Sequence, residues 1–300
     1  FSAPPALVII NKFKKLNFPG TKMKKFLPIL LLSVICIYLF TGTGIKEFTS
    51  AAKISEDTLY FEGEKHFKNI KQLTFGGENA EAYFSFDGNK FSFQTTRSGS
   101  ECDQIYKMYT DGSEQTLVST GKGRTTCAYY MPDNKHILFA STHLASDLCP
   151  PKPDLRKGYV WALYDTYDIF VATESGEIVK QLTNEKGYDA EATVSPMGDR
   201  IVFTSTRNGD IDIYTMNLDG SDVKQLTDEI GYDGGPFYSF DGKKIVYRRT
   251  RFDSEESKTK YKDLLTQGLI RPTYLDIFIM DADGSNKVQV TNNTAANFAP

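Results

Sequence analysis

The stretch DIYTMNLDGSDVKQLT, residues 212–227, alternates apolar and polar residues, turns at Asp-Gly and ends in a polar tripeptide. Near-copies stand at 168–183 (DIFVATESGEIVKQLT) and 276–291 (DIFIMDADGSNKVQVT), and a looser copy at 104–119 (QIYKMYTDGSEQTLVS). Alternation with period two indicates strands, and Asp-Gly between two such runs indicates a hairpin. The chain therefore repeats one strand–turn–strand unit, which points to a repeat architecture.

The repeat is regular along the chain. Its terminal tripeptide stands at 72–74, 117–119, 181–183, 225–227 and 289–291. The steps between these positions are 45, 64, 44 and 64 residues, so the basic unit has about 44 residues and two units carry insertions of about 20. Repeats of this length indicate that each unit packs against its neighbours.

Each unit contains signals for four short strands. An apolar run leads into a turn, an alternating strand and a polar loop follow, and the strand–turn–strand stretch completes the unit. The first turns, at 85–88, 132–134, 195–198 and 239–242, are rich in Asp, Ser, Pro and Gly. Four antiparallel strands in every 40 to 50 residues or so are typical of a β-propeller blade. We therefore predict an all-β protein, a β-propeller of about four blades plus the start of a fifth, over residues 65–300.

One blade cannot bury both of its faces, so blades must pack against each other around an axis. We expect the aromatic residue of each third strand to lie between blades: Tyr106, Phe170, Tyr214 and Phe278. Residues 65–74 are predicted to form an outer strand without a blade of its own, and 292–300 to begin an inner strand. The sequence is accordingly interpreted as a fragment of a longer ring.

Two insertions, 143–166 and 253–275, fall between the second and third strands of units two and four. The first is rich in proline and holds the single tryptophan, Trp161, so regular structure is not expected in it. The second is predicted to form a helix capped near Ser254 and ended by Gly268. In a propeller both loops lie on one face, where they either carry function or cover apolar surface.

The N-terminus differs in composition from the rest. Residues 1–22 precede Met23 and are interpreted as a non-native upstream segment. Residues 23–45 have a basic start and a 15-residue apolar run, the layout of a signal peptide, with an uncleaved N-terminal anchor as the alternative. A linker, 46–64, follows. We expect a periplasmic or secreted protein, attached to the membrane only if this segment stays uncleaved.

Three cysteines follow this segment: Cys102, Cys127 and Cys149. An oxidising compartment allows one disulfide and one free thiol. Three unbridged thiols fit the sequence equally well, and spacing does not choose the pair. The formal net charge of −3 at pH 7 does not favour a nucleic-acid partner.

Residues 195–227, SPMGDRIVFTSTRNGDIDIYTMNLDGSDVKQLT, resemble the repeat of TolB-type propellers. That repeat usually reads Ser-Pro-Asp-Gly, an apolar strand, Ser-x-Arg, a polar loop, Ile-Tyr, Asp-x-Asp-Gly and Leu-Thr. The resemblance covers about 65–300 and is weakest in unit two. It implies a six- or seven-bladed ring that binds proteins or peptides on one face and in its central channel. Similar propellers also precede the hydrolase domains of prolyl-oligopeptidase-like peptidases, where they screen substrates.

Sequence motifs for catalysis are missing from the 300 residues, which contain no Gly-x-Ser-x-Gly, HExxH or phosphate-binding glycine loop. We leave enzymatic activity open and lean against it. The Asp-rich turn at 281–284 lacks the late acidic ligand of a calcium loop. No cofactor is expected, with a calcium ion on the ring axis as the alternative.

The ligand site is expected where inner loops converge on the axis. The predicted channel-mouth residues are Glu81, Arg124, Asp189, Glu191 and Asp233, and the predicted face-loop residues are Arg97, His143, Trp161, Arg207 and Arg249. An acidic centre with a basic surround suits peptide or protein ligands through charge complementarity. The alternative is that these side chains are solvated or pair with each other.

Three functions remain after this reasoning. We prefer a non-catalytic exported propeller that binds a protein or peptide partner on its insertion-bearing face. The alternative is the substrate-gating propeller of a longer peptidase whose catalytic domain lies beyond residue 300. The third is a propeller that binds a glycan, with Trp161 and Tyr159 as sugar platforms, or that carries an unrecognised activity in its channel.

Overall fold

The computed structural model of the chain describes residues 63, 65–97, 99–293 and 295–298. The expectations for 1–22 and 23–45, and for nearly all of 46–64, lie outside the described residues. The described strands all lie in the larger of the chain's two units, which holds residues 72–300, and the described residues 63 and 65–71 contain no strand. Among the helices that can be described, none is both long and apolar enough to cross a membrane.

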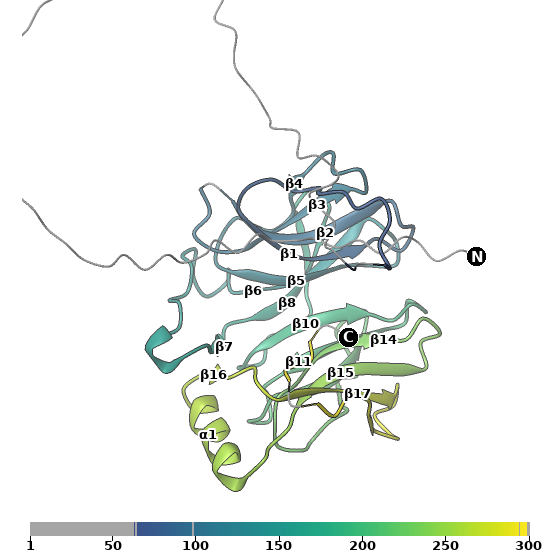
Figure 1. Ribbon diagram of the computed structural model, residues 1–300. Helices are drawn as coiled ribbons and strands as arrows, with labels where there is room; N and C mark the ends of the chain where they lie inside the picture. Colours follow the sequence, from purple (N-terminus) through teal and green to yellow (C-terminus); the bar gives the residue numbers. More distant parts are fainter. Residues whose placement is uncertain (1–62, 64, 98, 294, 299–300) are drawn as a thin grey trace, which may run out of the picture. The chain divides into compact units, whose positions relative to one another are not determined.

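Four antiparallel sheets, here called blades 1 to 4, follow one another along the larger unit, each built from strands in chain order (Figure 1). Blade 1 contains β1 (Glu78–Phe84), β2 (Lys90–Thr96), β3 (Gln104–Tyr109) and β4 (Thr116–Leu117), and blade 2 contains β5 (Thr125–Tyr130), β6 (His136–Ser141), β8 (Asp168–Thr173) and β9 (Ile178–Gln181). Blade 3 contains β10 (Asp189–Val194), β11 (Arg200–Ser205), β12 (Asp212–Asn217) and β13 (Lys224–Gln225), and blade 4 contains β14 (Asp233–Tyr238), β15 (Lys244–Thr250), β17 (Leu275–Asp281) and β18 (Val288–Gln289). The prediction of an all-β propeller of four-stranded blades is confirmed.

The repeated tripeptide clamps the fourth strand of a blade onto the third. In blade 3, Thr227 Oγ1 donates to Asp212 Oδ1 at 3.0 Å and accepts the Ile213 N–H at 2.9 Å. Gln225 Nε2 donates to the other carboxylate oxygen of Asp212 at 3.2 Å. One carboxylate is thus bonded by both polar members of the tripeptide, which explains why Asp at the start of β12 and Gln-Leu-Thr at its partner recur together.

The same clamp is present in the other blades. Thr183 donates to Asp168 and Thr291 to Asp276, both at 3.1 Å. Blade 1 departs from the repeat at both ends of the clamp, because Ser119 donates to Gln104 Oε1 at 2.7 Å. The looser copy QIY…LVS therefore keeps the interaction with a different pair of side chains.

Three apolar clusters fill the seams between successive blades. The cluster between blades 2 and 3 contains Phe203 and Tyr214, and that between blades 1 and 2 contains Phe139 and Phe170. Fully burying an aliphatic or aromatic side chain of this kind contributes about 1.5–3 kcal/mol. The expected place of Phe170 and Tyr214 between blades is confirmed, and Phe278 packs, partly buried, against the cluster between blades 3 and 4.

The predictions for the two end segments, residues 65–74 and 292–300, have different outcomes. Residues 65–74 form no strand, so the prediction of an outer strand there is wrong for this structure; an outer strand needs a neighbour to pair with, and none of the described strands pairs with this segment. At the other end, the Asn297 N–H donates to Leu275 O at 2.9 Å, as the Asp233 N–H donates to Ile211 O at 3.0 Å at the start of blade 4. Asn297 thus holds the position relative to Leu275 of β17 that Asp233 holds relative to Ile211, just before β12.

The two insertions meet each other. The first holds a short 3-10 helix, η2 (Leu155–Lys157), and β7 (Trp161–Ala162), and the second holds α1 (Glu255–Leu265) and β16 (Leu269–Ile270). Strands β7 and β16 pair antiparallel, so an insertion of blade 2 is joined to an insertion of blade 4. Helix α1 begins with a capping box at Ser254, as predicted, and Gly268 at φ +66° follows its last turn.

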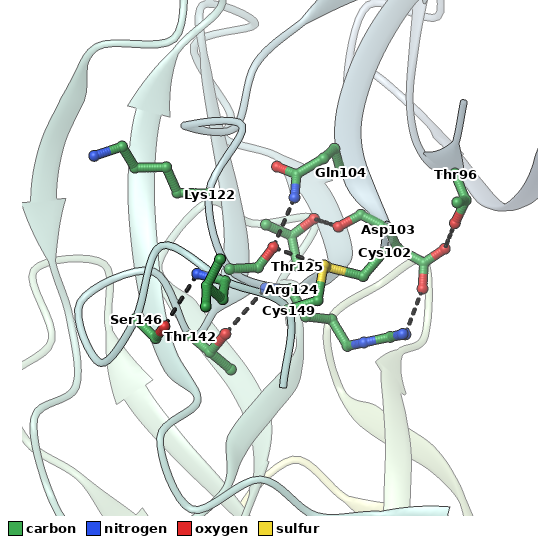
Figure 2. Close-up of a disulfide and its surroundings, with 12 residues drawn as sticks. Thr96, Cys102, Asp103, Gln104, Lys122, Arg124, Thr125, Thr142, Ser146 and Cys149 are labelled. Carbon is green, nitrogen blue, oxygen red and sulfur yellow. Dashed lines mark hydrogen bonds and ion pairs between the residues drawn. A yellow bond between two sulfur atoms is a disulfide. The ribbon is translucent and has the colours of Figure 1, made fainter. Parts of the chain in front are cut away.

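A disulfide ties the first insertion to blade 1 as well. Cys102, in the loop after β2, is bonded to Cys149, and their Cα atoms lie 6.0 Å apart (Figure 2). Of the three cysteines that the structure describes, Cys127 is free. Beside the disulfide, Lys122 pairs with Asp147 at 2.8 Å. The first insertion is therefore fixed to blade 1 at one end and to the second insertion at the other.

Replacing Thr227 by Val should lower the free energy of unfolding by about 1–3 kcal/mol, because the buried Asp212 carboxylate and the Ile213 N–H each lose a partner. Thr227→Ser keeps the hydroxyl and should cost clearly less than the Val variant. The exposed control Thr110→Val should stay within about 0.5 kcal/mol of wild type. Urea denaturation measures all three, and equal losses for the Ser and Val variants would contradict the clamp.

Removing the disulfide in a Cys102→Ala/Cys149→Ala variant should lower the free energy of unfolding by about 2–4 kcal/mol, because the unfolded chain gains freedom. A thiol reductant should lower the stability of the oxidised wild type by a similar amount and leave the double variant unchanged. A reductant effect of equal size in both proteins would assign the loss to something other than this bond.

Candidate ligand site at the propeller axis

Every first strand carries a β-bulge at the same place. The register shifts between Ala80 and Tyr83 in β1, Thr126 and Tyr129 in β5, Ala190 and Thr193 in β10, and Gly234 and Phe237 in β14. The bulge residues all have left-handed φ angles: Glu81 (52°), Cys127 (53°), Glu191 (55°) and Gly235 (58°). Bulges redirect a side chain relative to the strand, and here they do so at one level in all four blades.

The four bulge residues line one cavity. It has a volume of about 100 Å³ and is also lined by Tyr83, Phe237 and Arg248, so inner strands of blades 1 to 4 all reach it. The site therefore lies where the inner strands converge, on the propeller axis. Glu81 and Glu191 were predicted for the channel mouth, and the structure brings both to this cavity.

Glu191 is held by a dense set of donors. Its carboxylate accepts from Thr204 Oγ1, Tyr232 Oη and the Gly235 N–H, each at 2.8 Å. Arg248 forms an ion pair with the same carboxylate, and its Nε donates to Tyr232 Oη at 3.1 Å. Burial alone would lower the pKa of Arg248, but the facing Glu191 outweighs it and raises the pKa. Arg248 is thus held as a cation in a fixed position against this carboxylate.

Glycine replaces the acid in blade 4 for a steric reason. At Gly235, a Cβ would collide with the Arg248 guanidinium, and φ is left-handed there. A side chain at this position would displace Arg248 from Glu191. The cavity is therefore built from two acids, one thiol and one arginine rather than from four equivalent residues.

Glu81 and Cys127 form the second half of the cavity wall. Loss of hydration around its carboxyl raises the pKa of Glu81, and the nearby Glu191 carboxylate adds to this. A hydrogen bond from Cys127 lowers the pKa. Burial, with the neighbouring carboxylates of Glu81 and Glu191, raises the pKa of the Cys127 thiol well above its usual value. Cys127 is therefore a protonated donor rather than a nucleophilic thiolate at neutral pH.

An aromatic layer follows two residues after the bulges. The ring centroid of Tyr83 lies 5.6 Å from that of Tyr129 and 5.4 Å from that of Phe237. Tyr129 and Phe237 are 6.1 Å apart, so the three rings contact each other across blades 1, 2 and 4. Two of these rings, those of Tyr83 and Phe237, line the axial cavity and give it an aromatic wall.

Three of the predicted channel-mouth residues are engaged elsewhere. Arg124 pairs with Asp103 at 2.7 Å, and Asp189 accepts two bonds from Arg207 at 3.0 and 3.1 Å. Asp189 and Asp233 are buried, at 1% and 0% exposure, because the strand places them two residues before the bulge and inside the blade. Their placement at an open channel mouth is therefore corrected.

The predicted basic surround packs on aromatic rings. Arg97 lies 4.7 Å from the Tyr106 ring, the His143 ring 4.5 Å from Phe170, Arg207 5.1 Å from Tyr214 and Arg249 5.6 Å from Phe278. Each cation or imidazole thus covers the third-strand aromatic of its own blade. Burial, with help from Lys122, lowers the pKa of His143, so that ring is neutral at neutral pH.

Trp161 is the face-loop residue that reaches the axis. Its ring lies 5.7 Å from Arg248 Cζ and 6.3 Å from the Tyr232 ring. The joined insertions therefore contact the Glu191–Arg248 pair directly.

Sequence reasoning missed Arg248, Tyr232 and Cys127. Cys127 stands at the same repeat position as Glu81 and Glu191, so a register that included unit two would have found it. Arg248 gave no such signal, because the matching positions hold Gln94, Ala140 and Thr204, which share no chemistry with it.

A calcium ion needs six to eight oxygen ligands. Both carboxylate oxygens of Glu191 already accept bonds from protein donors. Across the described part of the chain, no group of three or more His, Cys, Asp or Glu side chains is arranged to hold a metal. Calcium on the axis stays a prediction.

The buried Asp233 should make stability depend on pH. Burial raises its carboxyl pKa well above the usual value, Arg249 opposing this, and Arg249 Nε lies 3.4 Å away. A raised folded-state pKa means that the stabilising contribution is complete below about pH 3.9, the unfolded value, and is lost as pH rises through the folded value. Asp233→Asn should therefore gain stability relative to wild type between these limits as pH rises. The exposed control Asp263→Asn should show no such trend in melting temperature, and a flat difference for Asp233→Asn would contradict the assignment.

Comparisons with known proteins agree with the strand topology. Residues 159–272 match the family model of the TolB beta propeller domain. Among solved structures, a protein assigned to TolB from Agrobacterium tumefaciens superposes with a TM-score of 0.52 at 22% identity, over 69% of this chain and 62% of that one. TolB from Acinetobacter baumannii gives a TM-score of 0.53 at 19% identity, over 73% of this chain and 45% of its own length.

This chain thus spans only about half to two thirds of those two proteins, and identities this low establish the fold alone. None of the curated proteins matches the sequence. Taken together, the repeat and the blades show that the described chain is a β-propeller, and its residues 159–272 are similar to the TolB beta propeller domain.

Proposed function

We propose that this TolB-like propeller is a non-catalytic exported protein that binds a protein or peptide partner on the face where its two insertions meet, next to the axial cavity. The observation that carries the proposal is the contact of Trp161 with Arg248. It joins the insertion pair β7–β16 to the charged centre of the ring, so one partner can contact both.

The surface beside this contact has the composition of a binding site. Tyr159 is 66% exposed and Phe298 43% exposed, and their rings lie 6.4 and 5.8 Å from that of Trp161. We call these three residues the aromatic patch. Exposed aromatic residues on a rigid support are the usual anchors of protein interfaces, since they bury much area at little entropic cost.

The rigid support is provided by the fold. Tyr261 of α1 and Ile270 of β16 are buried in a cluster with Ile211, Tyr232 and Leu275, against which Trp161 packs. A surface held in this way loses little freedom when a partner binds, which favours affinity.

The features that indicate export also indicate where the partner is found. The basic and apolar segment at 23–45 and the Cys102–Cys149 disulfide both suit the periplasm or the cell exterior. We infer that the partner is an envelope or secreted protein rather than a nucleic acid.

Peptides selected from a phage-displayed library against the oxidised protein should lose affinity by about tenfold or more with Tyr159→Ala, because the aromatic patch loses an exposed anchor. The matched control is Tyr109→Ala, which removes another exposed tyrosine at the end of β3, away from the insertions. Isothermal titration calorimetry measures both. Failure to enrich any peptide, or equal losses in the two variants, would argue against this face.

A further inference from the structure

A second concave region lies along the insertion helix. A cavity of about 580 Å³ is bordered by the end of β15, by β17 and by Lys258 of α1. A neighbouring cavity of about 440 Å³ shares Thr250, Arg251 and Phe252 with it and continues along α1. We call the two together the helix groove. An extended peptide advances about 3.3 Å per residue, so a groove of this size accommodates a few residues.

The larger cavity of the helix groove is strongly cationic. It is lined by Arg249, Arg251, Lys258 and Lys287, against one acid, Glu229. Glu229 is bonded to Arg249, which is itself buried. Lys287 is exposed, and none of the ion pairs found within the described residues involves it. Lys258 pairs only with the exposed Glu255, at 2.9 Å, a contact of small net stabilisation.

Apolar side chains lie between these charges. Phe252, Phe278 and Ile230 line the same cavity, and Ile230 is 41% exposed. Phe252 also packs on Tyr261, with ring centroids 5.4 Å apart, so its position is fixed from behind. The cavity therefore offers apolar contact and positive charge side by side.

The repeat explains why the cavity is open in blade 4. In blade 3, Arg207 covers the Tyr214 ring and bonds Asp189. In blade 4 the residue at the matching position, Arg251, instead bonds Asn292 Oδ1 and Asn293 O at 2.9 Å. Arg249 takes over the aromatic ring. The departure from the repeat coincides with the insertion whose helix supplies the second wall.

We propose that the helix groove binds an acidic peptide segment, with carboxylates between Lys258 and Lys287 and an adjacent apolar side chain against Phe252 and Ile230. Charge complementarity selects this occupant. Arg249 and Arg251 already pair with acids, whereas Lys258 pairs only with the exposed Glu255 and Lys287 with no acid among the described residues. The inference deepens the proposed function by naming the chemistry of the bound partner, and it rests on that function.

The test uses the full chain and a fluorescein-labelled peptide, GEFEEG, with GQFQQG as its uncharged counterpart, measured by fluorescence anisotropy. GEFEEG should bind, GQFQQG should bind at least about fivefold more weakly, and raising NaCl from about 50 to about 300 mM should weaken GEFEEG binding through screening. No binding of GEFEEG at millimolar concentration, or equal binding of the two peptides, would overturn the proposal.

Two variants locate the site. Lys258→Glu should weaken GEFEEG binding by about fivefold or more. Lys262→Glu makes the same charge change on the same helix at an exposed position that lines neither cavity, and it should change affinity by less than about twofold. Equal effects of the two variants would mean that the protein's net charge, rather than Lys258 in the helix groove, determines the affinity, and would overturn the proposal.

The outcome separates this inference from the proposed function. Library peptides that depend on Tyr159 but not on Lys258, while GEFEEG does not bind, would remove the acidic-segment proposal and leave the binding face intact. If the library peptides do not depend on Tyr159 and GEFEEG does not bind, both the binding face and the acidic-segment proposal are wrong.

Discussion

The bond from a serine or threonine hydroxyl of the tripeptide to the polar residue that opens the third strand is the interaction on which each blade depends. The fourth strands have only two to four residues, too few for backbone pairing alone to fix them. Thr227 and Gln225 fasten β13 to Asp212, and Thr183 with Gln181 do the same at Asp168. The fixed fourth strand then leads the chain to the start of the next blade, which lets the seam between blades close over its aromatic residues.

The candidate sites in this architecture lie where the repeat is broken. The bulge makes every inner strand present one residue to the axis, and the four blades fill that position differently, with Glu81, Cys127, Glu191 and Gly235. The insertions and the displaced Arg251 are further departures. Positions that hold the fold are nearly identical in each blade, whereas positions that reach the axial cavity and the helix groove differ from blade to blade.

Much of the fold could be predicted from sequence because its determinants are local. Asp-Gly turns, alternating strands and the clamp tripeptide lie within 16 residues of each other in the copy at 212–227. The site was only partly predictable, because a β-bulge changes the side of the sheet to which the following side chains point. Counting from the strand start placed Asp189 and Asp233 at the channel together with Glu191, whereas in the structure only Glu191 of these three lines the cavity. Likewise, the pairing of Trp161 with Ile270 joins segments more than 100 residues apart and leaves no local trace.

The pairing of β7 with β16 changes how the ring responds to stress. In repeat proteins each unit normally interacts only with its two neighbours, so local opening can spread one unit at a time. Here blade 2 is fastened to blade 4 across blade 3, and the disulfide fastens the same insertion to blade 1. Blade 3 therefore cannot move away from one neighbouring blade without straining its contact with the other. On this face the blades open together rather than one at a time.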